Sequence, residues 1–187
     1  MDDAWKQRPL HAKSVPGVLT AEECDAIKND ALAVGMSRAL VRTPKGMRKL
    51  RGRTCEVARL PRTKDREWLY ERLMATNEAI NAEYWRFALN SIEEVQVLRY
   101  KPMQRFDWHF DTGHGLARKL TCVVNLSPPR SHWRGGLEVR GEHHGKSKAR
   151  QQGAATIFPT YLRHRASSPW VGQRWSLVTW LSGPAWV

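Results

Sequence analysis

The second half of the sequence is a succession of short apolar runs, and this pattern most constrains the fold. The runs are rich in Val, Leu and Trp and cover residues 94–100, 119–126, 136–140, 154–158 and 174–181. Clusters of Gly, Pro and Ser separate them, for example "SPPRSHWRGG" and "SSPWVGQ". Short strands with turn signals and no helical pattern between them are typical of antiparallel sandwiches and barrels. We therefore predict a mainly β fold, of which a jelly roll is one form.

The residues before position 93 carry helical patterns. Thr20 and Glu23 form a T-x-x-E capping box ahead of apolar residues at helical spacing. A second, longer helix is predicted over residues 63–85, and we expect both helices to pack against a sheet. A length of 187 residues suits a single domain. Residues 1–92 are expected to form a helical and extended support region, and residues 93–187 a jelly-roll core.

The composition excludes several classes of protein. The first residues contain no apolar segment typical of a signal peptide, and no stretch is apolar for about 18 residues. We therefore expect neither secretion nor membrane insertion. The cysteines, Cys24, Cys55 and Cys122, are odd in number and lack C-x-x-C spacing. They argue against a disulfide framework or a zinc finger and indicate three thiols in a reducing, cytoplasmic compartment.

Positive charge is concentrated in one segment of a chain whose formal net charge is +13. Residues 42–53, "RTPKGMRKLRGR", contain Pro and two Gly and are predicted to form a mobile basic loop. Such a loop can bind phosphates or an acidic partner with salt-dependent affinity, or it can be a solvated surface of a basic protein. Both interpretations remain open from the sequence. After Asp111 the only carboxylate side chains are Glu138 and Glu142.

Metal-binding residue types gather in "RFDWHFDTGHG", residues 105–115. Residues two apart on a strand point the same way, so His109 and Asp111 can present an imidazole and a carboxylate to one point. His164, which follows the apolar run 154–158, is the natural third ligand if a jelly roll returns that strand alongside the first. Two His and one carboxylate leave three octahedral positions open, as in the facial triad of non-haem iron oxygenases. A polar turn is the alternative.

Other residues of these types are predicted to lie outside the site. Asp107 can orient His109 or face solvent. His114 lies in a predicted loop, and the pair His143 and His144 lies at a polar hairpin tip. None of these is chosen as a ligand.

Ten residues after His164, Arg174 and Ser176 share one face of a predicted strand. A guanidinium and a hydroxyl among apolar walls form a receptor for a carboxylate, because Arg binds it through two hydrogen bonds and Ser adds one. A buried Arg without an acidic side chain nearby in sequence is costly unless an anionic ligand arrives. We therefore predict an anionic co-substrate at Arg174.

These motifs resemble those of the iron(II)- and 2-oxoglutarate-dependent oxygenases, in their prolyl-4-hydroxylase-like branch. The likeness runs from about Val15 to the C-terminus and includes "GVLTAEECDAI", "VLRYKPMQRFDWHFD", "RKLTCVVNLS", "GGLEV" and "FPTYLRHRASSPWVGQRWSLVTWLSGPAW". It implies a double-stranded β-helix with helices packed on the major sheet. It also implies Fe(II), 2-oxoglutarate and O2 as cofactor and co-substrates, with ascorbate as a candidate reductant.

The resemblance assigns roles to individual residues. It implies that Fe(II) is bound by His109, Asp111 and His164. It implies that the C5 carboxylate of 2-oxoglutarate is bound by Arg174 and Ser176, with Tyr100 lining that pocket and Asn125 adding a polar contact. Relatives usually carry Gly where this chain has Met103, so we expect the loop before the ligands to be strained and to take a different path.

The implied reaction is hydroxylation of an aliphatic C–H of a peptide, protein or amino acid, with succinate and CO2 as co-products. One alternative is a nucleic-acid-modifying oxygenase like the AlkB branch, but that branch has a second Arg where this chain has Trp180. Others are a metal-dependent hydrolase, for which carboxylates are scarce, and a basic nucleic-acid-binding module without catalysis. Trp133 and Trp170, expected in loops, are candidate substrate contacts.

Overall fold

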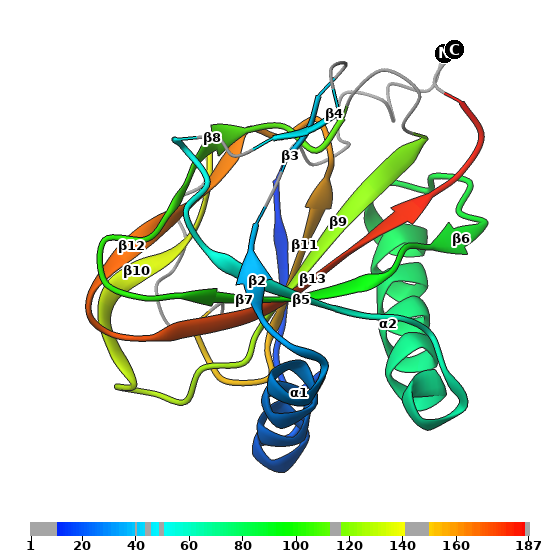
Figure 1. The fold of residues 1–187 in the computed structure, drawn as a ribbon. Helices are drawn as coiled ribbons and strands as arrows, with labels where there is room; N and C mark the ends of the chain where they lie inside the picture. The colour runs from blue at the N-terminus through cyan, green and yellow to red at the C-terminus, as the bar shows by residue number, and fades with distance from the viewer. Residues whose placement is uncertain are drawn as a thin grey trace.

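Two antiparallel sheets face each other, and two helices lie on the other side of the larger sheet (Figure 1). The structure is a computed structural model that describes residues 11–39, 41–43, 46–48, 51–112, 117–140 and 150–185. This arrangement is a jelly roll with helices packed on its major sheet, and the predicted fold class is confirmed. Within the described residues, no helix combines the length and apolar character that a membrane span requires.

The larger sheet has eight strands. In spatial order they are β1 (Lys13–Val15), β11 (Ala155–Pro159), β9 (Arg118–Asn125), β13 (Arg174–Ser182), β7 (Val95–Tyr100), β5 (Glu56–Leu60) and β2 (Ser37–Arg38), and β6 (Ser91–Ile92) pairs with β13. The smaller sheet consists of β10 (His132–Val139), β12 (His164–Gly172) and β8 (Phe106–His109). A separate hairpin is formed by β3 (Val41–Thr43) and β4 (Gly46–Arg48).

The helices begin where the sequence predicts. In α1 (Ala21–Val34), the Thr20 hydroxyl accepts from the Glu23 amide at 3.2 Å and the Glu23 carboxylate accepts from the Thr20 amide at 2.9 Å, which completes the capping box. A 3₁₀ turn, η2 (Lys64–Arg66), leads into α2 (Glu67–Tyr84). The Tyr70 hydroxyl of α2 donates to the Leu60 carbonyl at 2.5 Å and accepts from the Val95 amide at 2.9 Å. This one side chain therefore ties α2 to both β5 and β7.

The larger sheet has two faces with different functions, as β13 shows. Leu177 and Leu181 point into the core shared with the helices. Val178 and Trp180 point into the second core, between the sheets. Because side chains alternate along a strand, Arg174 and Ser176 face the same inter-sheet space as Val178 and Trp180. One face of β13 therefore stabilises the fold while the other is available for a site.

The structure corrects three details of the sequence-based prediction. Residues 167–172, predicted to be a loop, continue β12, and residues 132–135 begin β10. Trp133 and Trp170 consequently lie on strands and not in loops. The basic segment 42–53, predicted to be a mobile loop, overlaps the hairpin of β3 and β4. The three cysteines are free thiols, as predicted, and all three are buried.

Met103 occupies a backbone conformation that favours glycine. Its φ is +67° and its side chain is 78% exposed, so no packing of the side chain offsets the strain. The Met103 amide donates to the Pro169 carbonyl at 3.3 Å, which holds this turn against β12. The chain thus keeps the strained left-handed conformation at Met103 despite the side chain, and a different path of this loop from that in relatives stays a prediction.

We predict that Met103→Gly raises the free energy of unfolding by roughly 0.5–1 kcal/mol, because relief of the left-handed strain exceeds the extra unfolded-state entropy of Gly. In a chain of this size the melting temperature should rise by about 1–4 °C. Met103→Ala is the matched control and should give no such gain, since Ala retains the Cβ. Equal melting temperatures for the Gly and Ala variants would contradict the assignment of strain.

Candidate functional site

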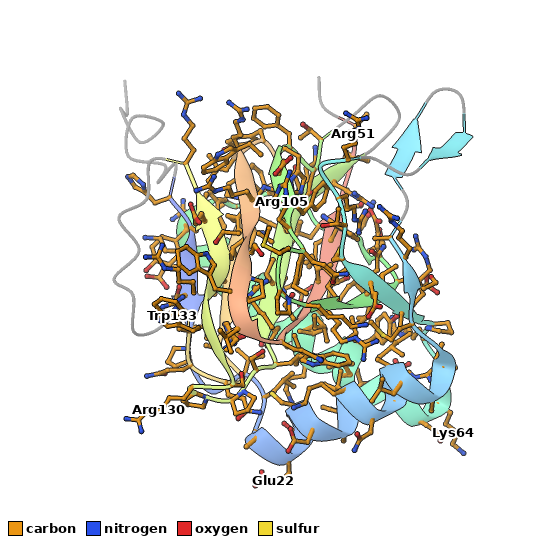
Figure 2. The ribbon with its side chains drawn as sticks, turned by 60° about the vertical axis from the view of Figure 1, so that its left-hand side comes forward. Glu22, Arg51, Lys64, Arg105, Arg130 and Trp133 are labelled. Carbon is orange, nitrogen blue, oxygen red and sulfur yellow. The ribbon has the colours of Figure 1, made fainter. Side chains whose placement is uncertain are left out.

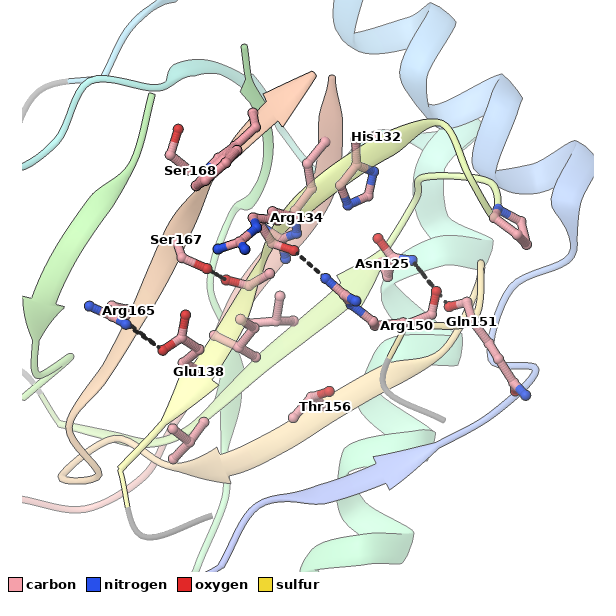
Figure 3. Close-up of a pocket in the computed structure, with 18 of the residues that line it drawn as sticks. Asn125, His132, Arg134, Glu138, Arg150, Gln151, Thr156, Arg165, Ser167 and Ser168 are labelled. Atoms are coloured by element: carbon pink, nitrogen blue, oxygen red, sulfur yellow. Dashed lines mark hydrogen bonds and ion pairs between the residues drawn. The ribbon is translucent and has the colours of Figure 1, made fainter. Parts of the chain in front are cut away.

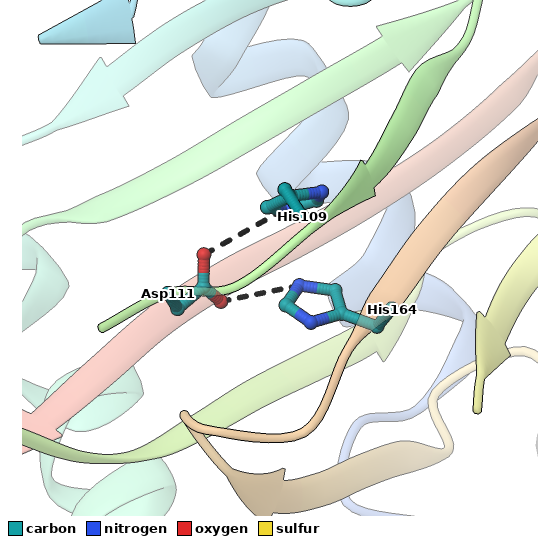
Figure 4. Close-up of side chains that lie close together, drawn as sticks. All are labelled: His109, Asp111 and His164. Carbon is teal, nitrogen blue, oxygen red and sulfur yellow. Dashed lines mark ion pairs between the residues drawn. The ribbon is translucent and has the colours of Figure 1, made fainter. Parts of the chain in front are cut away.

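Strands β8 and β12 bring the candidate metal ligands together. His109 is the last residue of β8 and His164 the first of β12, and the two are direct partners in the antiparallel register. Asp111 follows two residues after β8, where its amide donates to the Thr160 carbonyl at 3.1 Å. One ligand atom from each residue lies within 4.8 Å of the others. Figure 4 shows the three side chains close together, with Asp111 facing both imidazoles. Among the described parts of the chain, this is the one such group of three or more His, Cys, Asp or Glu.

The carboxylate of Asp111 lies between the two imidazoles. Its Oδ2 is 3.2 Å from His164 Nε2, and its Oδ1 is 3.6 Å from His109 Nε2. The side chains of His164 and Asp111 are 5% and 9% exposed, and that of His109 is 20% exposed. The group is therefore largely shielded from water, with His109 on its more open side.

Both imidazoles are oriented by the backbone two residues earlier. His109 Nδ1 donates to the Asp107 carbonyl at 2.8 Å, and His164 Nδ1 donates to the Leu162 carbonyl at 2.9 Å. A carbonyl can only accept, so each Nδ1 carries a proton, which leaves each Nε2 as the ring atom that faces Asp111. This tautomer is the one that a metal requires of a ligand bound through Nε2.

Neighbouring side chains fix the three residues further. The Thr121 hydroxyl of β9 donates to Asp111 Oδ2 at 2.8 Å. The Phe106 ring stacks on His109 with centroids 3.5 Å apart and an interplanar angle of 17°. The Phe158 ring meets His164 edge-on at 4.7 Å. These contacts prevent the side chains from rotating away from the common centre.

The electrostatics of the group keep Asp111 ionised and His109 neutral, the states in which these two residues bind a cation. Burial lowers the pKa of His109 to about 4, helped by the nearby positive charge of His164, so its imidazole is neutral at pH 7. Burial alone would raise the pKa of Asp111, but the hydrogen bond from His164 and the charges of both imidazoles hold that pKa well below its usual range. Burial is the largest single influence on His164 and lowers its pKa, but the hydrogen bond to Asp111, the charge of Asp111 and the hydrogen bond to the Leu162 carbonyl together raise that pKa. An ionised carboxylate with two inward-facing imidazoles fits Fe(II) with positions left open.

Arg174, the first residue of β13, lies opposite Tyr100 of β7. Its side chain lines a cavity of about 1480 Å³, shown in part in Figure 3, and the residue is 5% exposed. Burial lowers the pKa of the guanidinium, and the charged or titratable groups that act on it are Tyr100, Arg150 and Cys55. No carboxylate of the described residues is among them. A buried cation of this kind fits an anionic ligand such as the carboxylate of 2-oxoglutarate.

The remaining predicted co-substrate residues lie around Arg174 in different ways. Ser176 is 1% exposed and faces the same inter-sheet space. The Tyr100 ring centroid is 5.4 Å from the central carbon of the Arg174 guanidinium. Asn125 lines the cavity, but its amide nitrogen donates to carbonyls of the chain, including that of Arg150 at 2.9 Å. That contact makes Asn125 a support of the cavity wall, and its binding of 2-oxoglutarate stays a prediction.

Several residues considered from the sequence lie elsewhere. His114, His143 and His144 fall outside the described residues. The Asp107 carboxylate points to Arg105, whose Nε is 2.7 Å away, so it is the carbonyl of Asp107 that orients His109. The chain just before β5 is hydrogen-bonded to β8, since the Asp107 amide donates to the Gly52 carbonyl at 2.7 Å. The end of the basic segment 42–53 therefore runs beside the ligand strand.

Sequence reasoning missed four residues around the site. Thr121 and Phe106 support the ligands, and His132 and Arg150 line the cavity near Arg174. Thr121 could have been found, because period two on β9 places it on the face of Asn125. The other three depend on strand register and loop path, for which the sequence contains no local signal.

Comparison with known proteins agrees with this geometry. Residues 95–182, from the first residue of β7 to the last of β13, match the model of the 2OG-Fe(II) oxygenase superfamily. No curated protein sequence matches the chain significantly.

Solved structures of prolyl hydroxylases share the fold. A prolyl-4-hydroxylase of Pseudomonas putida matches with a TM-score of 0.73 and 16% identity over 91% of this chain and 92% of that one. A prolyl hydroxylase of Trichoplax adhaerens, in complex with a peptide of hypoxia inducible factor, matches with a TM-score of 0.73 and 13% identity over 95% and 86%. The viral collagen prolyl hydroxylase of Paramecium bursaria Chlorella virus-1, in complex with 2OG, matches with a TM-score of 0.66 and 18% identity over 92% of this chain and 96% of that one.

At these identities the solved structures establish the fold, while the family model covers the strands that hold the His–Asp–His group and Arg174. Residues 95–182 therefore belong to the 2OG-Fe(II) oxygenase superfamily, and the chain is a 2-oxoglutarate-dependent dioxygenase that uses Fe(II).

Proposed function

We propose that His109, Asp111 and His164 bind Fe(II), and that Arg174, assisted by Ser176, binds the C5 carboxylate of 2-oxoglutarate. The observation that carries the proposal is that two sites border the inter-sheet core: His164 packs on Phe158 of that core, and Arg174 lies on the strand face of Val178 and Trp180. One is a buried group of two imidazoles and a carboxylate, and the other is a buried guanidinium without a described carboxylate partner. When bound, Fe(II) and 2-oxoglutarate supply the oxidising chemistry, and succinate and CO2 are the co-products.

The residues of this chain orient the reactants and exclude water. The backbone carbonyls behind His109 and His164 keep both Nε2 atoms directed at the metal position. Thr121 holds Asp111 by one oxygen, so the other oxygen remains directed toward the metal position. Tyr100 and Arg174 form the buried end of the co-substrate pocket, where low water content strengthens the hydrogen bonds to a carboxylate.

We further propose that the substrate is a peptide, protein or amino acid hydroxylated at an aliphatic C–H, within a single domain formed by residues 1–187. The likeness in fold to prolyl hydroxylases supports this choice, one of them bound to a peptide. The position six residues after Arg174, where a nucleic-acid-modifying relative would carry a second Arg, holds Trp180, which is 7% exposed in the inter-sheet core. A nucleic-acid substrate is favoured by the net charge of the chain and by the basic segment 42–53, but by no described contact of the site.

Replacing any of the three proposed ligands by Ala should abolish iron binding and succinate formation without unfolding the domain. The physical reason is that two remaining ligands hold Fe(II) too weakly in a site that must also leave positions open. Iron content of the purified protein and succinate release are the measurements. Asp107→Asn is the matched control and should retain iron, because the carbonyl of Asp107 and not its carboxylate contacts His109. A variant of the triad with full iron content and turnover would remove that residue from the site.

Arg174→Lys should lower the affinity for 2-oxoglutarate by about ten- to a hundred-fold, while the affinity for iron stays unchanged. Lys keeps the charge but cannot form two parallel hydrogen bonds, and one charge-assisted hydrogen bond contributes roughly 1.5–3 kcal/mol. Ser176→Ala should also lower the affinity for 2-oxoglutarate without changing that for iron, and the loss should be smaller than in Arg174→Lys. The affinities are measured by titration of the metal-loaded protein with 2-oxoglutarate.

Arg165→Lys is the control for the Arg174 experiment, because Arg165 also lines the cavity but pairs with Glu138 at 2.7 Å. It should leave 2-oxoglutarate affinity unchanged. An Arg174→Lys enzyme with unaltered 2-oxoglutarate affinity, or one that lost iron instead, would show that Arg174 does not hold the co-substrate.

A further inference from the structure

The cavity lined by Arg174 contains more guanidinium groups than one co-substrate carboxylate can neutralise. Its other arginines are Arg130, Arg134, Arg140, Arg150 and Arg165. Among the described lining residues the single carboxylate is that of Glu138, which accepts from Arg165 Nε at 2.9 Å and Nη2 at 2.7 Å. If Arg174 takes the carboxylate of 2-oxoglutarate, the charge of the remaining arginines is still unbalanced. Arg130, Arg134, Arg140 and Arg150 are exposed, so water solvates them, and they offer a binding position for a second anion without requiring one.

Arg150 is built into the cavity wall close to Arg174. Its Nη2 donates to the Gly135 carbonyl of β10 at 2.8 Å, and its own carbonyl accepts from the Asn125 amide at 2.9 Å. The backbone and the guanidinium of Arg150 are thus both held, and Figure 3 shows this side chain and His132 among the residues that line the cavity. The charge of Arg150 acts on both Arg174 and His132.

His132 complements this charge as a neutral hydrogen-bonding group. Burial, together with the positive charges of Arg174 and Arg150, lowers the pKa of His132 to about 4. At pH 7 the imidazole is therefore uncharged, and its Nδ1 is 3.1 Å from the Ser131 hydroxyl. His132 adds a polar contact beside the two guanidinium groups without adding to their mutual repulsion.

The rim of the cavity combines a guanidinium with two exposed tryptophans. The Arg134 guanidinium lies 4.0 Å from the Trp170 ring centroid and 5.4 Å from that of Trp133. The two indoles meet edge to face at 5.1 Å and are 57% and 55% exposed for Trp133 and Trp170. Figure 2 shows Trp133 and the neighbouring Arg130 on the same side of the molecule. Exposed aromatic surface of this kind marks an interaction site more often than a solvated surface.

The backbone of β10 is distorted where it presents these side chains. A bulge shifts the register between Trp133 and Arg134, and Arg134 has a φ of +57°. Gly135 follows with a φ of +73°, and a Cβ there would lie 2.7 Å from the Pro169 backbone nitrogen. Bulges and strained residues re-aim side chains at sites of function. The distortion here places Arg134 over Trp170.

We propose that Arg150, Arg134 and His132 form a second anion subsite in this cavity, separate from Arg174, that binds a carboxylate side chain of an acidic peptide substrate. The inference rests on the proposed function and adds the substrate class. Apolar parts of the peptide pack on Trp133 and Trp170. A peptide is favoured over a nucleic acid because Arg150, His132 and Arg174 converge on one space and do not follow a groove for successive phosphates. Arg134 also covers part of the Trp170 face that a base would stack on.

The test uses capped hexaglutamate and hexaglutamine as probes, with the full chain loaded with Mn(II) and 2-oxoglutarate without oxygen. Hexaglutamate should bind at least about tenfold more tightly than hexaglutamine, as followed by tryptophan fluorescence and calorimetry. Arg150→Gln and Arg134→Gln should each lower the affinity for hexaglutamate by about tenfold, which is the effect of losing one charge-assisted hydrogen bond. The affinity for 2-oxoglutarate should change by less than about twofold in both variants.

Two controls separate the subsite from general effects of charge and stability. Arg163→Gln removes the same charge from an exposed arginine that does not line the cavity, and it should leave hexaglutamate binding unchanged. Arg150→Lys is the second variant, for the case that Arg150→Gln disrupts the structure of the cavity. It retains the charge and should retain most of the hexaglutamate affinity. Melting temperatures verify that each variant is folded.

Four results would overturn the proposal. Equal affinities for hexaglutamate and hexaglutamine, or an equal loss of hexaglutamate affinity in Arg163→Gln, would mean that there is no charge-specific subsite. A loss of 2-oxoglutarate affinity in Arg150→Gln as large as that in Arg174→Lys would make Arg150 part of the co-substrate site. Tighter binding of an oligothymidylate through the same residues would make the partner a nucleic acid. Failure of the proposed function is distinguishable, because it appears in the 2-oxoglutarate titration of Arg174→Lys, which involves no peptide.

Discussion

The pairing of β8 with β12 is the constraint on which the site depends. His109 and His164 are 55 positions apart in sequence but are register partners, so their imidazoles approach one another without any loop having to place them. Each ring is then turned by a hydrogen bond to a carbonyl two residues before it. Strand geometry and two local hydrogen bonds thus determine the direction of both Nε2 atoms before any metal arrives. Preorganisation of this kind lowers the free-energy cost of binding the ion.

The larger sheet connects this group to the co-substrate pocket. β13 lies between β9 and β7, so its inner face carries Arg174 beside Tyr100 on one neighbour and Ser176 beside Asn125 on the other. The same alternation directs Leu177 and Leu181 to the helices. Buried polar residues are therefore confined to the inter-sheet face of the larger sheet. The apolar core on the helix side offsets the free-energy cost of burying them.

Features with a local period were predictable from the sequence, and features that depend on long-range register were not. The H-x-D pair, the R-x-S pair and the capping box at Thr20 are all short-range patterns, and the structure places each on the expected face or helix end. The choice of His164 as partner of His109 depended on assuming a jelly roll and on the resemblance to a family, because β pairing over this separation leaves no local mark in the sequence. The extent of β12 was missed because Pro169, Ser167 and Gly172 are turn-type residues. Here the bulge in β10 opposite Pro169 accommodates the missing N–H of proline.

The separation of the fold into two cores has an evolutionary consequence. Because the helices and the outer face of the larger sheet form an apolar core of their own, substitutions between the sheets leave that core intact. The residues lining the cavity can therefore diverge toward new substrates while the framework persists. A shared fold at 13–18% identity with the matched prolyl hydroxylases is the outcome expected of such a division. Selection on this lineage can act on specificity and on foldability as nearly independent traits.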